Sequence, residues 1–158
     1  MSSAFQTLLQ EFAQSKGMAV EDSSYGLEFE CEDTRVYVLQ HPLHDDRLLC
    51  EVSVVAFGDE PGANVLSLLL QINEAARFDH DWTIVMDGDL EVSLTTAALL
   101  QGMNVAGLEA LMLDGVERSQ VLKGIVQEVI EAASQESAGS SAQASYVGGV
   151  DPMMMMRG

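Results

Sequence analysis

The residues best equipped for covalent chemistry are two cysteines and the histidines nearest to them. The cysteines are Cys31 and Cys50, and His41 and His44 lie between them in the sequence. A cysteine nucleophile reacts as its thiolate, which an apolar environment disfavours. Because both cysteines fall within strand-like apolar patterns, we expect buried free thiols. A small enzyme that pairs Cys31 or Cys50 with His41 or His44 is therefore the weaker alternative, and we expect no enzymatic activity.

Metal and cofactor sites are poorly supported by residue spacing. The candidate oxygen ligands are four aspartates: Asp79, Asp81, Asp87 and Asp89. No window containing them has the Gly at position six and the Glu at position twelve of a calcium-binding loop. A hairpin turn explains Asp87 and Asp89 better, and the pair His41 and His44 is too small for a zinc site. Since the sequence also has no phosphate-binding or dinucleotide-binding motif, we expect no metal and no cofactor.

The charge of the chain restricts its partners. Its 158 residues contain 25 acidic side chains against 7 Lys and Arg, a formal net charge of -18. Such a surface repels nucleic-acid phosphates and anionic membrane lipids, so we expect neither partner. It favours solubility and suits a partner with basic character. The N-terminal pattern is amphipathic rather than that of a signal peptide, and no segment is apolar for the length of a membrane span, so we predict a cytoplasmic protein.

Periodicity predicts one domain over residues 1–133. Alternating apolar and polar residues indicate strands, whereas apolar residues three and four positions apart indicate helices. The order of these patterns predicts an α+β fold with an antiparallel sheet and helices packed on it. The expected elements are a helix from Ser2 or Ser3 to about Lys16, strands near 27–32, 35–41 and 47–57, a helix over 63–78, strands at 82–86 and 90–94 joined by a type I′ turn at Asp87-Gly88, and a helix from about Val105 to Ala133 with a candidate break at Gly115.

Residues 134–158 differ in composition from the rest of the chain. They are rich in Ser, Ala, Gly and Gln and contain a run of four methionines, Met153 to Met156. Such a composition buries too little apolar surface to offset the entropy of ordering, so we expect a disordered tail. The methionines are either an adhesive tip for a partner or a feature without a function.

The helix predicted over 63–78 is apolar on more than one side. One stripe is expected to face the core: Val65, Leu69, Ile72 and Ala76. A second set spreads over most of the remaining circumference: Leu66, Leu68, Leu70 and Ala75. Either one subunit wraps this helix completely, or a second copy of the chain packs on it. Because two-fold dimers dominate soluble oligomers, we expect a homodimer.

The second and third predicted strands are apolar on both faces. The residues opposite the core-facing sets are Tyr37, Leu39, Leu49, Val55 and Phe57. If no helix covers them, they form an apolar patch large enough to bind a partner. A sheet edge beside such a patch can bind an extended peptide as an added strand. The alternative is that the long last helix covers this face.

Taken in order, these features resemble one family, the class I chaperones of bacterial type III secretion, also called the Tir-chaperone-like group. The resemblance covers about residues 1–133, and its specificity lies in the ordered set rather than in one motif. The helix predicted over 63–78 also matches a Leu-Leu-x-x-Asn-like run that is common in this family. The features are the N-terminal helix with Phe5, Leu8, Leu9 and Phe12, three acidic-faced strands, the run Leu69-Leu70-Gln71-Ile72-Asn73, the hairpin from Ile84 to Leu94, and the closing helix with Leu108, Leu111 and Met112.

This resemblance implies a function as well as a fold. It implies a homodimer whose central helix and adjacent hairpin strand lie near the two-fold axis. The interface residues it assigns are Leu66, Leu69, Leu70, Ile72, Trp82 and Ile84. It further implies binding of the N-terminal segment of one or more secreted effectors in extended form, without ATP or cofactor, and delivery to the secretion ATPase. The tail and the long closing helix depart from the family pattern and leave a multi-effector subclass open, and a chaperone-like adaptor or regulatory domain outside secretion is the alternative.

Overall fold

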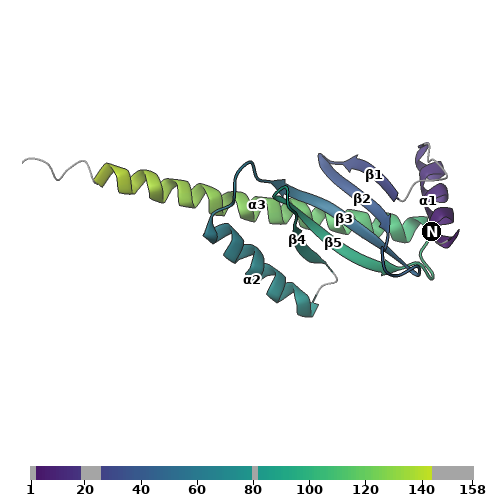
Figure 1. Ribbon diagram of the computed structural model, residues 1–158. Helices are drawn as coiled ribbons and strands as arrows, with labels where there is room; N and C mark the ends of the chain where they lie inside the picture. Colours follow the sequence, from purple (N-terminus) through teal and green to yellow (C-terminus); the bar gives the residue numbers. More distant parts are fainter. Residues whose placement is uncertain (1–2, 19–25, 80–81, 144–158) are drawn as a thin grey trace, which may run out of the picture.

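The computed structural model describes residues 3–18, 26–79 and 82–143 (Figure 1). The order of its elements is the one expected from periodicity, and the α+β prediction is confirmed. The elements are α1 (Ser3–Lys16), β1 (Gly26–Cys31), β2 (Thr34–Gln40), β3 (Arg47–Ala56), α2 (Ala63–Asp79), β4 (Thr83–Met86), β5 (Glu91–Leu99) and α3 (Val105–Gln143).

The five strands form one antiparallel sheet in the order β1-β2-β3-β5-β4. Helix α3 packs across one face of the sheet, mainly against β3, and α1 packs on the same face beside β1 (Figure 1). The rings of Phe12 in α1 and Phe29 in β1 lie 5.9 Å apart, and Lys16 forms an ion pair with Glu109 of α3. The apolar residues of α1, α3 and alternate strand positions therefore form a single core on this face.

Helix α2 lies beside the sheet next to its edge strand β4 rather than over its centre (Figure 1). The side-chain amide of Asn73 donates to the Ile84 carbonyl at 2.9 Å, and its oxygen accepts the Ile84 amide hydrogen at 2.7 Å. Asn73 thus occupies the backbone donor and acceptor that an edge strand leaves unpaired. The same asparagine ends the Leu-Leu-x-x-Asn-like run of the sequence.

The turn between β4 and β5 differs in type from the one expected. Leu90 donates its amide hydrogen to the Asp87 carbonyl, and Leu90, not Gly88, has a positive φ, of 62°. The connection between β4 and β5 is therefore a three-residue loop with a left-handed last residue, and the type I′ prediction is wrong. Asp87 Oδ1 accepts the amide hydrogens of Asp89 and Glu91, each at 2.9 Å, so the turn does use these aspartates. Of the other candidate ligands, Asp81 lies outside the described residues.

Helix α3 is longer than periodicity predicts. It runs without a break through Gly115 and continues past Ala133, its expected end, to Gln143. The Asn104 side chain caps its first turn by accepting the amide hydrogen of Gly107 at 2.8 Å. Residues 144–158, including Met153 to Met156, lie outside the described residues. In the described part of the chain, no helix is long and apolar enough to cross a membrane.

Gly115 has a packing role instead of a breaking one. A Cβ atom at this position would lie 2.6 Å from the Trp82 ring and 2.8 Å from a methyl group of Val52. Glycine therefore lets the backbone of α3 lie directly on the indole and on the centre of β3.

Candidate functional site

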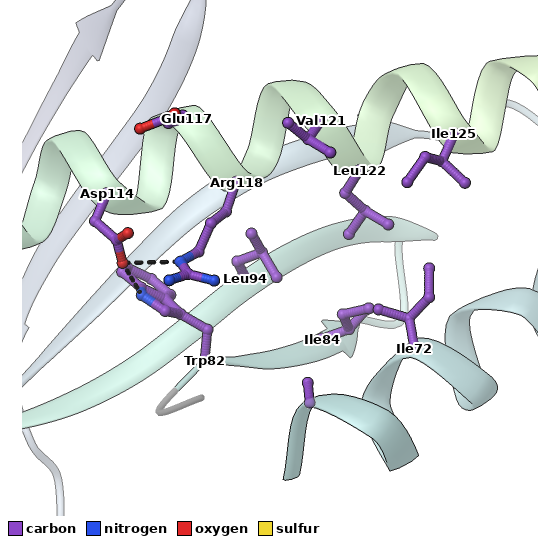
Figure 2. A pocket seen from close by; sticks show the side chains of 11 residues that line it. Ile72, Trp82, Ile84, Leu94, Asp114, Glu117, Arg118, Val121, Leu122 and Ile125 are labelled. Carbon is purple, nitrogen blue, oxygen red and sulfur yellow. Dashed lines mark hydrogen bonds and ion pairs between the residues drawn. The ribbon is translucent and has the colours of Figure 1, made fainter. Parts of the chain in front are cut away.

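An apolar groove of about 480 Å³ lies between α2, the β4–β5 hairpin and α3 (Figure 2). Aliphatic side chains line most of it, and the polar residues gather at one end, on α3. The lining residues are Ile72 and Ala76 from α2, Trp82, Ile84 and Leu94 from the hairpin region, and Asp114, Glu117, Arg118, Val121, Leu122 and Ile125 from α3.

The polar end of the groove is a small hydrogen-bonded network. Asp114 Oδ2 accepts the indole hydrogen of Trp82 at 2.8 Å and the Nε hydrogen of Arg118, also at 2.8 Å (Figure 2). The hydrogen bond that Arg118 donates to Asp114 raises the pKa of Arg118 above its ordinary value. This network satisfies the indole and holds Trp82 against α3, so it shapes one wall of the groove.

The structure separates the residues assigned to a self-association surface into two groups. Leu69 and Trp82 are each only 6% exposed and belong to the core of the chain itself, so they have almost no side-chain surface left for a partner. Leu66, Ile72 and Ile84 are half-buried, and Leu70 is 70% exposed. Sequence periodicity could not make this distinction, because all of these residues are apolar and share one helix or hairpin.

The structure adds two residues of α3 that sequence reasoning did not assign to a site. Val121 is 61% exposed and Ile125 is 38% exposed. Both line the groove, and Ile125 points from α3 towards α2 and β4 (Figure 2). The helical pattern of α3 gave no separate signal for them. Each is next in sequence to a buried residue, Leu122 or Val126, that belongs to the core.

The face of the sheet opposite α3 carries part of the predicted apolar patch. Leu39 of β2 and Leu49 of β3 are cross-strand neighbours, and both are half-buried, as is Tyr37. On β5, Ala97 lies opposite Leu49, and Leu99 on the same face is 52% exposed. These five residues therefore form an open apolar surface on this face of the sheet.

Val55 and Phe57 do not lie on this open face, so the expectation that all five predicted patch residues share one face is wrong. Ser53 pairs with Ser93, but the next paired residue on β3 is Val55, opposite the buried Val92. A β-bulge inserts one residue here and reverses the alternation that follows. Val55 and Phe57 consequently pack against the core.

The open face also carries charged and polar groups towards its other end. Arg35 of β2 reaches across to Glu91 of β5, with 2.7 Å between Nη2 and Oε1, and this pairing raises the pKa of Arg35. Partial burial and a hydrogen bond with Glu28 raise the pKa of Tyr37. One end of this face thus carries both acidic and basic side chains, and the other end is apolar. This division would impose an orientation on a segment bound to the face.

The structure places Cys50 in the core of the chain and leaves Cys31 half-buried. Burial raises the pKa of Cys50 to about 12, so its thiolate is disfavoured in the folded protein. The rings of His41 and His44 lie 4.8 Å from each other, and His41 Nδ1 accepts the Leu43 amide hydrogen at 3.1 Å. Both histidines lie in the connection between β2 and β3, and these are contacts within that connection.

We expect Cys50 to be protected from thiol reagents in the folded protein. At pH 8 its reaction with a disulfide reagent is expected to be at least about 100-fold slower than in denaturant, because both access and thiolate formation require unfolding. Mass spectrometry of the labelled peptides measures Cys50 and Cys31 separately. Fast native labelling of Cys50 would contradict its placement in the core.

Comparison with known proteins identifies the fold. No protein-family model matches the sequence, and no curated protein matches it. A chain of the crystal structure of the ExsC–ExsE complex aligns with a TM-score of 0.64 and 21% identity over 80% of this chain and 97% of that chain. A chain of the HopA1–SchA chaperone–effector complex aligns with a TM-score of 0.60 and 16% identity over 77% of this chain and 94% of that one.

A third solved structure contains the Yersinia pestis type III secretion chaperone SycH in complex with a stable fragment of YscM2. One of its chains aligns with a TM-score of 0.56 and 16% identity over 75% of this chain and 98% of that chain. These alignments confirm the resemblance at the level of fold. They also leave a fifth to a quarter of this chain outside each match.

Proposed function

We propose that this chain, which has the fold of the type III secretion chaperones, is a cytoplasmic chaperone for one or more secreted effectors. It binds the N-terminal segment of the effector in extended form and keeps it soluble and competent for secretion. The observation that carries the proposal is the likeness in fold to chains of chaperone–effector complexes, together with an apolar sheet face on which, among the described residues, Leu39 and Leu49 are only half-buried. Binding requires no ATP, because a surface that offers apolar contacts and backbone pairing needs no chemical step.

The open sheet face and the edge strand β1 are the proposed effector site. Tyr37, Leu39 and Leu49 provide the apolar contacts, and among the described strands β1 pairs with β2 alone. The opposite edge differs, because Asn73 occupies the backbone groups of Ile84. An added effector strand at β1 would gain backbone hydrogen bonds, and its alternate side chains would contact the two faces of the sheet. Contacts spread along an extended segment offset the entropy lost when it becomes ordered.

The chaperone works as a homodimer, and its complex with effector is handed to the secretion ATPase. The exposed Leu70 and the groove between α2 and α3 support self-association, since an apolar surface of this kind is costly to leave in water. The acidic surface of the chain supports solubility of the loaded complex. The greater length of this chain relative to the chains it aligns with leaves room for a multi-effector role.

A pair of glutamate substitutions tests the effector site. Leu49→Glu, in the middle of the open face, is expected to reduce effector recovery about tenfold or more, because a charge replaces an apolar contact in the binding surface. Leu43→Glu is the control, since Leu43 is 82% exposed in the β2–β3 connection and lies outside the patch. The measurement is purification of each variant from the native host under mild, nucleotide-free conditions, followed by quantitative mass spectrometry of the proteins recovered.

Three results of this experiment would each mean something different. Recovery of secreted proteins with wild type and Leu43→Glu, but not with Leu49→Glu, supports the proposal. Equal recovery by all three proteins would show that the open face is not the site. Recovery of proteins without any secreted member would overturn the secretion role in favour of an adaptor.

A further inference from the structure

The groove between α2, the hairpin and α3 is apolar along most of its length and acidic at one end. Ile125 of α3 and Ile72 of α2 line its two sides (Figure 2). At the acidic end Asp114 and Glu117 stand against one cation among the described lining residues, Arg118, which forms an ion pair with Asp114. The groove therefore suits an apolar segment that ends in a positive charge.

The chain contains such a segment beyond the end of α3, outside the described residues. Residues 153–156 are four methionines, and Arg157 follows them directly. The other ranges outside the described residues, 1–2, 19–25 and 80–81, do not combine an apolar run with a cation. Methionine is unbranched and flexible, so it fills irregular apolar surfaces well. The segment thus matches the groove in both polarity and charge.

The length of chain after α3 is enough to bring this segment back to the groove. Helix α3 ends at Gln143, and Ile125 lies 18 residues before that end, about 27 Å along the helix axis. The ten residues from Gln143 to Met153 span up to about 33 Å when extended. A second hollow, of about 340 Å³, lies between the same two helices next to Ile130, which is nearer to the end of α3. The returning chain can therefore run between α2 and α3.

The spacing within the segment also fits the spacing along the groove. Ile125 and Glu117 are eight residues apart on α3, which is about 12 Å of helix. An extended segment from Met153 to Arg157 covers about 13 Å. Alternate residues of an extended segment point to the same side, so Met153, Met155 and Arg157 share one face. If the segment runs antiparallel to α3, these two methionines lie over the apolar part and Arg157 reaches the acidic end.

We propose that residues 153–157 bind in extended form in the α2–α3 groove of their own chain, with Met153 and Met155 over its apolar part and Arg157 at its acidic end. Tethering favours this contact, because a segment on a short linker is present at an effective concentration of about millimolar. The segment and a second copy would compete for the groove, whereas Leu70 does not line it and stays available to a partner. The inference goes beyond the proposed function and does not depend on the effector site, which lies on the opposite face of the sheet.

Thiol labelling of a probe in the groove tests this inference. Val121→Cys places a thiol at an exposed position of the groove lining, and mass spectrometry of the labelled peptides separates it from the two native cysteines. In the full chain, purified without effector, we expect the probe to react about tenfold more slowly than in the M153E/M155E background, because the two glutamates cannot enter an apolar groove. Leu113→Cys, on the same helix but outside the groove, is expected to react equally in both backgrounds.

The matched control is M154E/M156E, which has the same composition and charge but alters the face that points away from the groove. It is expected to keep the protection of the probe within about twofold. Equal loss in the two double variants, or a probe as reactive in the unaltered tail as in M153E/M155E, overturns the inference.

Two further measurements test the occupant and its orientation. Protection that falls when the protein is diluted overturns the inference, because a second copy then fills the groove. Arg157→Gln is expected to lower the protection about threefold, and unchanged protection would contradict the placement of Arg157 at the acidic end. Ile125→Cys is the second probe, with the same expectations, if Val121→Cys does not fold.

Discussion

Replacing Gly115 with alanine is expected to lower the free energy of unfolding by about 3 kcal/mol, although alanine is the better helix former. The added Cβ would lie 2.6 Å from the Trp82 ring and 2.8 Å from Val52. Neither neighbour can yield easily, since Val52 is fully buried in β3 and the Trp82 indole is held by Asp114. Helix α3 must therefore move away from the sheet, which loosens the contact that forms most of the core.

Gly124→Ala is the matched control in the same helix. A Cβ at Gly124 would meet nothing within 4 Å, so this substitution is expected to raise stability by about 1 kcal/mol. Chemical denaturation followed by Trp82 fluorescence measures both variants. Equal effects of the two substitutions would show that α3 does not lie as close to Trp82 as the structure places it.

Replacing Asn73 with leucine is expected to lower the free energy of unfolding by about 2 kcal/mol and to promote aggregation. Leucine has a similar size but cannot pair with the Ile84 backbone, which Asn73 contacts at 2.7 and 2.9 Å. The exposed amide and carbonyl of β4 would then be open to another strand. Denaturation measures the first effect, and light scattering over a concentration series measures the second.

Gln71→Leu serves as the control for Asn73→Leu. Gln71 is exposed on the same helix and contacts only Ser67 of α2, at 3.4 Å, among the hydrogen bonds described for it. Gln71→Leu adds the same apolar side chain without touching β4, so we expect little change in the free energy of unfolding. Asn73→Leu as stable as Gln71→Leu would mean that the contact with β4 contributes nothing to the fold.

Helix α2 has a buried side and an exposed side, so substitutions on the two sides test different properties of the protein. Leu69 is buried in the core and Leu70, its neighbour, is 70% exposed. A charge at Leu69 acts on the stability of one chain, whereas a charge at Leu70 acts on contact with a partner. Variants at Leu69 therefore cannot test self-association, although the resemblance assigned both residues to the interface.

Local periodicity determined the secondary structure of this protein. Alternation over Leu27, Phe29 and Cys31 predicts β1, and the apolar spacing of Phe5, Leu8 and Phe12 predicts α1. Both predictions hold because strand and helix periods of 2.0 and 3.6 residues follow from backbone geometry alone. The order of such patterns was enough for the α+β class and for the resemblance to the chaperones.

Only the tertiary structure decided which apolar residues remain available to partners. A bulge after Ser53 moved Val55 and Phe57 to the core face, and α3 covered Trp82 but left Val121 exposed. These outcomes depend on pairing between strands and on packing between helices that are distant in sequence, for which a local pattern carries no information. The sequence therefore determined that this chain has more apolar surface than one sheet face needs, and the packing of α2, β4 and α3 determined where that surface lies.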